Sequence, residues 1–225
     1  MLAALLGFVA VAVIATVTEI DVSELQRPLE RQPFIWAVLT VVPLFALLLG
    51  IRSFTDEFRH GSIVPTLLAS PNRARVLGAK LVTTAVGGVA FAAAAMALAF
   101  AVGVLLLMAR GVEVTWSATA IAEVTGRLVG ATALWTAVGV GFGLAVRHQV
   151  AAVAGALIWI LAGEGILSAF MPDIGTYFPG TVGSALVGAN AQGLLSPAMA
   201  AVVLAGWAAV AAVTGGVLMH RRDVA

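Results

Sequence analysis

Few side chains in this sequence have the type and the spacing that chemistry requires. Cysteine is absent, which excludes disulfides, thiolate zinc sites and cysteine nucleophiles. His60, His148 and His220 lie in different segments without an i,i+4 pair, so they are poor metal ligands. No histidine lies in an apolar stretch where it could activate Ser184, and no phosphate-binding G-x-x-x-x-G-K-[ST] loop occurs. We therefore expect no catalytic residue, metal or cofactor on this chain.

Glu123, Arg127 and Glu164 lie inside long apolar stretches, where an unpaired charge costs roughly 2.5–3.5 kcal/mol at the membrane centre. Counted along helices from the edge at residues 147–148, Arg127 lies about 30 Å and Glu164 about 24 Å away. Their similar depth favours a contact between Arg127 and Glu164 on two neighbouring helices. In the alternative, Glu123 pairs with Arg127 at i,i+4 on one helix, and Glu164 is protonated or lines a wet cavity.

The composition places these residues in a membrane protein. Of the 225 residues, 61% are hydrophobic and 10% charged, whereas a soluble domain is about 45–50% apolar and about a quarter charged. These values exclude a soluble globular domain, a disordered chain and a nucleic-acid binder. The net charge of +1 does not point to an acidic partner.

Six stretches are long and apolar enough, or nearly so, to cross a hydrocarbon core of about 30 Å as helices. We therefore predict an all-α integral membrane protein, with residues 1–225 forming one domain of six spans. The loop 171–197 is rich in Gly and Pro and contains the short apolar segment 181–189, which favours re-entrant or interfacial helices on the outer face. The predicted spans are 2–17, 34–51, 81–109, 117–146, 150–170 and 198–219.

The distribution of cations predicts that both termini and the loop 52–80 face the cytoplasm. The chain has 11 Arg and only 1 Lys, a bias typical of GC-rich bacterial genes, so we expect a bacterial plasma membrane. In this orientation the inside carries eight cations and the outside three: Arg52, Arg59, Arg73, Arg75, Lys80, Arg147, Arg221 and Arg222 against Arg27, Arg31 and Arg110.

The loop 52–80 is predicted to contain two short helices. Ser53 and Asp56 have the spacing of a capping box, which predicts a helix that begins at Ser53. On that helix Phe54 and Phe58 lie four residues apart and share a face. A turn at Gly61 then leads to a second short helix that carries Leu67 and Leu68.

Such helices could lie on lipid headgroups or dock on another protein. Anionic headgroups favour a basic face, whereas residues 56–60 mix acidic and basic side chains. We therefore favour protein docking, with Phe58 and the two leucines as anchors and with Glu57 and Arg59 setting the orientation.

The segment reads E-F-R-H-G-S-I at residues 57–63, T-L-L at 66–68, S-P at 70–71, R-A-R at 73–75 and K-L at 80–81. This pattern resembles the permease subunits of type-2 ATP-binding-cassette (ABC) exporters. In that family an E-x-R-x-G-[ST] segment between spans two and three forms a coupling helix that docks on the ATPase subunit. The resemblance implies that the ATPase-docking residues are Phe54, Glu57, Phe58, Arg59, Gly61, Leu67 and Leu68.

The resemblance also implies the partners. A permease of this family works in membrane lipid as a dimer with a second permease copy, and ATP and Mg²⁺ are bound by separate ATPase subunits. Six spans, and short helices on the outer face between spans five and six, also match the family. Its members usually begin with a basic amphipathic helix, which is absent here, so we expect that an upstream segment is missing from this chain.

Two other classes of function are compatible with a six-span protein. An ion-coupled carrier or channel without an ATPase would show charged residues near the midplane of several spans and some internal repeat symmetry. This sequence shows neither in quantity. A membrane anchor would use the loop 52–80 to recruit a soluble partner that has no ATPase activity.

Overall fold

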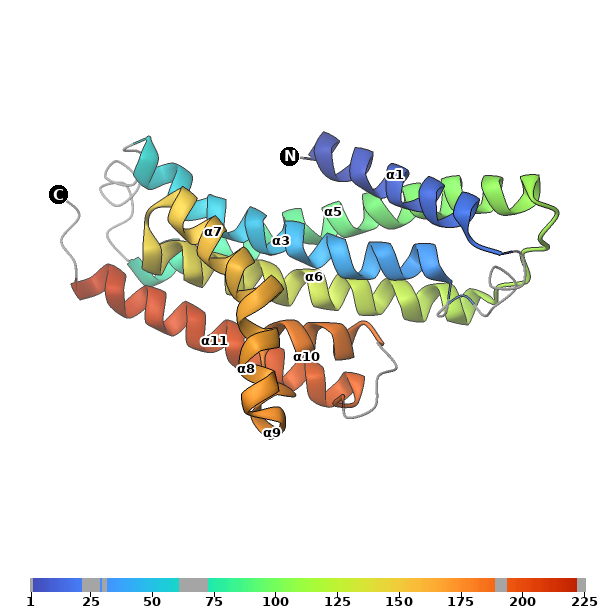
Figure 1. Cartoon of the computed structure of the whole chain (residues 1–225). Coiled ribbons are helices and arrows are strands. Elements are labelled where there is room, and N and C mark those ends of the chain that lie inside the picture. Colours follow the sequence, from blue (N-terminus) through green and yellow to red (C-terminus); the bar gives the residue numbers. More distant parts are fainter. Residues whose placement is uncertain (1, 22–28, 30–31, 61–72, 189–193, 222–225) are drawn as a thin grey trace.

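The computed structural model describes residues 2–21, 29, 32–60, 73–188 and 194–221, in which every regular element is a helix (Figure 1). Helices α7 and α8 are joined by the π-helical turn η2, so residues 149–170 form one continuous helix. In chain order the elements are α1 (Leu2–Glu19), α3 (Pro33–Arg59), α5 (Arg73–Ala109), α6 (Ala118–Val146), α7 (Gln149–Ile158), η2 (Trp159–Gly163), α8 (Glu164–Phe170), α9 (Pro172–Gly175), α10 (Pro179–Leu186) and α11 (Pro197–Arg221).

Six of these helices are long and apolar enough to cross a bilayer: α1, α3, α5, α6, the helix from α7 to α8, and α11. Large apolar side chains on their outer faces are exposed, as expected where a surface faces lipid rather than water; Val11 is 66% and Leu105 is 68% exposed. The prediction of an all-α, multi-pass membrane protein is confirmed.

The bundle has two ends, which we name after their arginines (Figure 1). At the Arg59 end, α3, α6 and α11 finish and α5 and α7 begin. At the Arg110 end, α5 finishes and α6 begins. There the guanidinium of Arg110 donates hydrogen bonds to the carbonyl oxygens of Val17 (2.5 Å) and Ile20 (2.7 Å). These bonds cap the last turn of α1 and hold it against α5.

Helix α6 is central, because it packs against α3 on one side, α11 on another and α5 on a third. Glycines permit this close packing. A Cβ atom on Gly50 of α3 would lie 2.8 Å from Val140 N and 2.9 Å from Gly139 Cα of α6, well inside van der Waals contact. On the opposite face of α6, Gly141 lies against the backbone of Ala211 in α11. Gly139, Gly141 and Gly143 of α6 thus serve packing within the chain.

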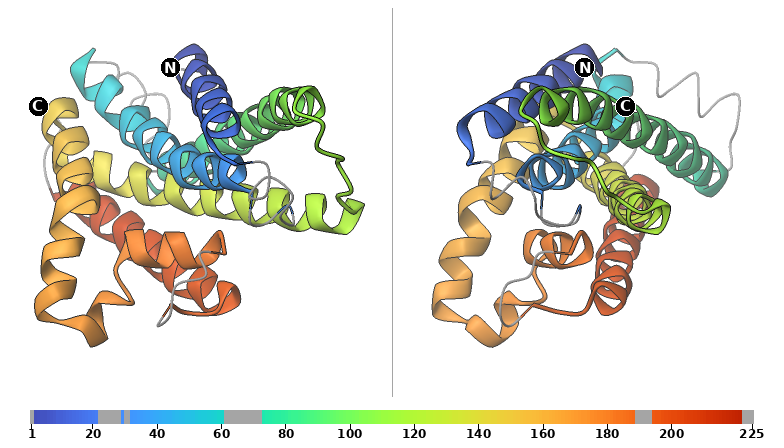
Figure 2. Two further views of the ribbon diagram at one scale, coloured as in Figure 1. Left: turned by 45° about the vertical axis from the view of Figure 1, so that its right-hand side comes forward. Right: turned by 90° about the vertical axis from the view of Figure 1, so that its right-hand side faces the viewer.

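The helix 149–170 is only shallowly embedded in the fold. Its path diverges from the other spans, so that α8 points away from the bundle in all views (Figures 1 and 2). Only 17% of its most apolar stretch is buried, compared with 56% for α3. After the short helix α9, α10 folds back and lies alongside α11 and α6.

The predicted helix start at Ser53 is wrong, because α3 continues through this position to Arg59. The hydroxyl of Ser53 donates to the carbonyl of Gly50 (2.7 Å), which is a bond within a continuing helix rather than a cap. Leu47, Ile51 and Phe54 are buried at helical spacing and continue the buried face of α3 toward its end. α5 likewise begins at Arg73, so the predicted loop 52–80 is helical at both of its described edges.

The contact of α3 with α6 predicts opposite effects for two glycines of the same helix. Gly139→Ala places a methyl group against the Leu47 carbonyl and should lower stability by about 1–3 kcal/mol. Gly126→Ala meets no atom within 4 Å and should be neutral or stabilising by up to about 1 kcal/mol. Thermal unfolding of the detergent-solubilised protein measures both; equal midpoints for the two variants would contradict this packing.

Candidate functional site

The sequence-predicted docking residues Glu57, Phe58 and Arg59 occupy the last turn of α3, at the Arg59 end. Phe54 lies one turn earlier and is fully buried with Val140 and Leu144 of α6, so it belongs to the chain's own core. Gly61, Leu67 and Leu68 lie outside the described residues.

Phe58 joins the end of α3 to the turn between α6 and α7. Its ring is half-buried and packs against the small cluster around Phe54. The guanidinium of Arg147 lies over this ring, 5.0 Å from the centroid, in a cation–π contact. Arg147 has a left-handed backbone conformation (φ 60°), in which its N–H caps α6 on the Gly143 carbonyl.

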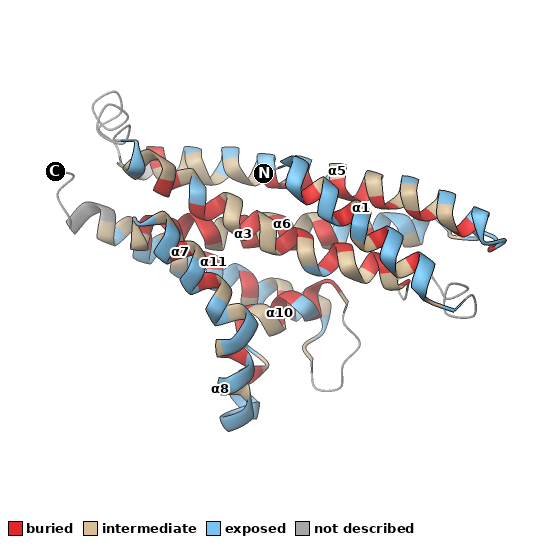
Figure 3. Ribbon diagram, turned by 45° about the horizontal axis from the view of Figure 1, so that its top comes forward, coloured by how far each residue is buried: buried red, intermediate tan, exposed pale blue. Residues whose placement is uncertain are grey.

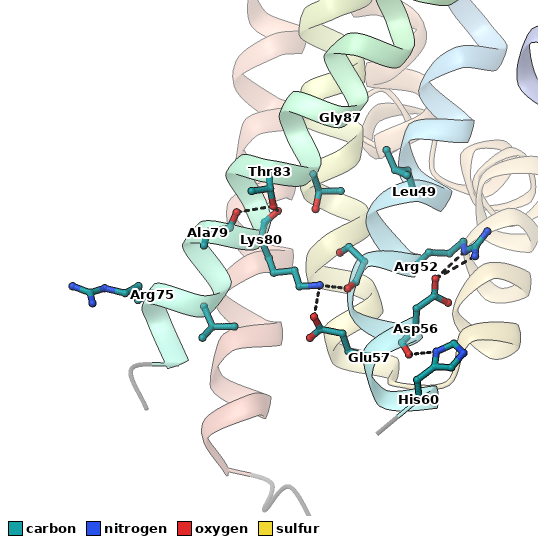
Figure 4. A pocket seen from close by; sticks show the side chains of 13 residues that line it. Leu49, Arg52, Asp56, Glu57, His60, Arg75, Ala79, Lys80, Thr83 and Gly87 are labelled. Atoms are coloured by element: carbon teal, nitrogen blue, oxygen red, sulfur yellow. Dashed lines mark hydrogen bonds and ion pairs between the residues drawn. The ribbon is translucent and has the colours of Figure 1, made fainter. Parts of the chain in front are cut away.

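Glu57 joins the end of α3 to the start of α5. Its Oε1 lies 2.7 Å from Nζ of Lys80, and the two side chains are only 19% and 23% exposed (Figure 4). The same ammonium group donates a 2.5 Å hydrogen bond to the Ser53 carbonyl and lies 5.3 Å from the centroid of the Phe54 ring. Lys80 is the single lysine of the chain. Sequence reasoning did not pair it with Glu57, because 23 residues separate them.

Arg59 makes the third connection. Its Nη1 donates to Oε1 of Gln149 at the first residue of α7 (3.3 Å). Arg59 and His60 are otherwise exposed, so the tip of α3 is held on its inner side and open on its outer side.

A cleft of about 1060 Å³ separates the end of α3 from the start of α5 (Figure 4). Its walls carry both charges, and Arg52 is paired with Asp56 at 3.2 Å across one turn of α3. A lining of mixed sign suits a polar protein segment better than a free anion or cation. The ionisable lining residues are Arg52, Asp56, Glu57, His60, Arg75 and Lys80.

The predicted contact between Arg127 and Glu164 is wrong. Arg127 pairs with Glu123, four residues away on α6. This local partner is within reach without ordering a second helix, and the Glu164 carboxylate faces α10 instead. The local pair of Arg127 with Glu123 is therefore confirmed, but the other part of that alternative, in which Glu164 is protonated or lines a wet cavity, did not anticipate the contact with α10.

Glu164 is only 4% exposed and caps the start of α10. Its carboxylate accepts hydrogen bonds from the backbone N–H of Gly180 (2.8 Å) and Thr181 (3.2 Å). The first residues of a helix have N–H groups without an intrahelical acceptor. Here Phe178 offers no polar side chain and Pro179 has no N–H, so Glu164 supplies the acceptor and complements the helix dipole.

Arg127 lies at the other end of α10. A Cβ atom on Gly188, which follows this helix, would overlap the guanidinium of Arg127. Gly188 has a positive φ of 96°, where glycine is favoured and where the backbone can approach the arginine. Glu164 and Arg127 thus bracket α10, with the anion at its N-terminus and the cation at its C-terminus, as the helix dipole favours.

Comparisons of the chain with protein-family models, with curated proteins and with solved structures found no match. Among the described residues, no group of three or more His, Asp or Glu side chains could hold a metal ion.

The capping role of Glu164 predicts a large cost for its removal. Glu164→Ala leaves two backbone donors without an acceptor in an apolar environment and should lower stability by about 2–3 kcal/mol. Glu113→Ala removes an exposed carboxylate from the connection between α5 and α6 and should cost less than about 0.5 kcal/mol. Thermal unfolding in detergent compares the two, and a cost for Glu113→Ala as large as that for Glu164→Ala would refute the capping role.

The pair of Glu57 with Lys80 should show a coupling free energy of about 1 kcal/mol in a double-mutant cycle of alanine variants, because it is mostly shielded from water. The exposed pair of Arg52 with Asp56 is the matched control and should give less than about 0.5 kcal/mol. Exchanging the charges, with Glu57→Lys and Lys80→Glu together, should recover part of the lost stability. Zero coupling for Glu57 and Lys80 would mean that the two helices are not joined here.

Proposed function

We propose that this chain is the membrane-spanning permease subunit of an ABC exporter, which moves a substrate across the bacterial plasma membrane with ATP hydrolysed by a separate ATPase subunit. The observation that carries the proposal is the attachment of the α3 tip. The segment that resembles the family's coupling helix, Glu57 to His60, is braced at once against α5, α6 and α7. An element that receives force from a partner must be joined rigidly to the spans that it moves.

The exposed side of the tip supplies the docking surface in this proposal. Arg59 and His60 are exposed, whereas Phe54 and the inner edge of Phe58 are held in the chain's own core. Arg59 and His60 would therefore meet the ATPase, while Phe58 and Glu57 would pass the movement to the spans. In this orientation both termini and the Arg59 end face the cytoplasm.

The complete transporter would contain a second permease copy and two ATPase subunits that bind ATP and Mg²⁺. Closure of the ATPases would press on both α3 tips and switch the paired permeases between inward-open and outward-open states. The short helices α9 and α10 lie between the last two spans, where such permeases have short helices on the outer face.

An ion-coupled carrier is the less favoured alternative. Such a carrier needs ionisable groups at membrane depth that can take up an ion or a proton. Here Glu164 is engaged with two N–H groups of α10, and Arg127 is engaged with Glu123. Within the described spans, these charges therefore have structural partners already.

Purification of the full chain from its native membranes tests the proposal. A polypeptide that is labelled by a photoreactive ATP analogue should co-purify in a stoichiometric amount. Arg59→Glu reverses an exposed charge at the proposed interface and should weaken this association about tenfold. Co-purification of no ATP-binding protein would favour the carrier, and a partner without ATPase activity would favour the anchor.

The matched control is Glu113→Arg, which reverses an exposed charge at the Arg110 end, between α5 and α6. This variant should retain the ATP-binding partner at the wild-type level. Equal losses for Arg59→Glu and Glu113→Arg would show that the association does not depend on the α3 tip, and the docking site would be wrong.

A further inference from the structure

An apolar cavity lies between α6, the helix 149–170 and α11, and neither the sequence motifs nor the proposed function accounts for it. Its volume is about 310 Å³. Pro179, at the start of α10, closes one end, and Val210 of α11, which is 60% exposed, lies on the side that opens to the membrane. Thr214 is the one hydroxyl residue of a lining otherwise made of apolar and aromatic side chains.

Three tryptophans line this cavity: Trp135, Trp159 and Trp207. Trp207 donates its Nε1 hydrogen to the Tyr177 carbonyl (2.9 Å), so its N–H group is already engaged. The ring of Trp159, on the η2 turn, packs edge-on against Phe178 with a centroid distance of 5.9 Å. Trp207 and Trp159 are thus fixed by the segment that leads into α10. A lining of this kind offers a ligand dispersion contacts but almost no hydrogen bonds.

The cavity extends along α6 from Trp135 to Ala145, ten residues apart and therefore about 15 Å along the helix axis. This length is about half of a hydrocarbon core of 30 Å, which is the depth of one lipid leaflet. An α-helix of this length and about 10 Å in diameter would occupy roughly 1200 Å³, several times the cavity volume of about 310 Å³, and does not fit.

We propose that this cavity binds one acyl chain of a bilayer phospholipid, with the end of the chain against Pro179 and Trp135 and its headgroup toward the Arg59 end. Water does not fill a cavity that lacks polar partners. At this depth the surrounding medium is hydrocarbon, and the side at Val210 is open to it. The shape accepts a single extended chain. Glu164 contributes indirectly, because it holds the helix that closes the inner end of the cavity.

Photolabelling of the full chain in lipid vesicles tests this site. Vesicles of phosphatidylglycerol and phosphatidylcholine would carry a trace of a phospholipid with a diazirine near the end of one acyl chain. After irradiation, peptide mapping by mass spectrometry should find adducts on Trp135 and Val138, which line the cavity on α6 at the end that the acyl chain reaches. Val210→Trp fills the open side and should reduce these adducts about tenfold, equivalent to about 1.4 kcal/mol of lost binding.

The matched control is Val213→Trp, on the same helix at a position that is 65% exposed and outside the cavity lining. It should leave the α6 adducts unchanged. Ala156→Phe fills the cavity from the opposite wall and should repeat the loss, which covers the case in which Val210→Trp fails to fold. Adducts that persist at wild-type level in both filling variants, or that appear on outward residues such as Val202 but not on α6, would overturn the proposal. Disulfide formation between two copies through Val210→Cys with no α6 adducts would assign the cavity to a second copy and would overturn it too.

Discussion

The backbone contact between α3 and α6 is the constraint on which the rest of this structure depends. In a bilayer, lipid tails are as apolar as the side chains, so the hydrophobic effect does not drive helices together and close packing must do so. Gly50 and Gly139 allow the two backbones to touch, and Gly141 does the same for α6 and α11 on the opposite face. A side chain at any of these positions would separate two helices. The buried residues accordingly concentrate on α3 and α6, whereas α1 and α8 present mostly exposed side chains (Figure 3).

Because α6 is central, both regions of interest are built on it. Its Arg147 end holds the tip of α3 through the ring of Phe58, and its other half carries Arg127, which reaches the end of α10. Between these points Trp135 packs against Gly183 of α10 and also lines the apolar cavity. The two ends of α10 thus explain why Glu164 and Arg127 lie at membrane depth. A short helix inside a membrane has unpaired backbone groups at both ends and no water to satisfy them, so a carboxylate at one end and a guanidinium at the other lower its cost.

The sequence predicted what depends on local composition and missed what depends on distant partners. The six apolar stretches follow from hydropathy, and the structure has six helices of the length and composition that a span requires. The helix start at Ser53 failed because a buried stripe through Phe54 outweighed a capping signal. The sequence favours a contact between Glu164 and Arg127, because the depth of each residue along its helix can be calculated. The actual contact of Glu164 with α10 depends on the path of the loop before α10, which local sequence does not reveal. The sequence indicates the pair of Glu57 with Lys80 only through the presence of a single lysine, because an ammonium group next to the membrane needs an anion.

The helix 149–170 joins the two regions along the molecule. Its first residue, Gln149, accepts a hydrogen bond from Arg59 at the tip of α3, and Glu164 near its other end holds the start of α10. Between these anchors it has few buried side chains, and the η2 turn interrupts its regular hydrogen bonding. A helix that is fixed at both ends and loosely packed between them can tilt as a unit without breaking a core. Under the proposed function, a push on the tip of α3 would move α3, α5 and α6 together, because Glu57, Phe58 and the glycine contact join them. The helix 149–170 would then tilt relative to these helices, displace α10 and alter the closed end of the apolar cavity.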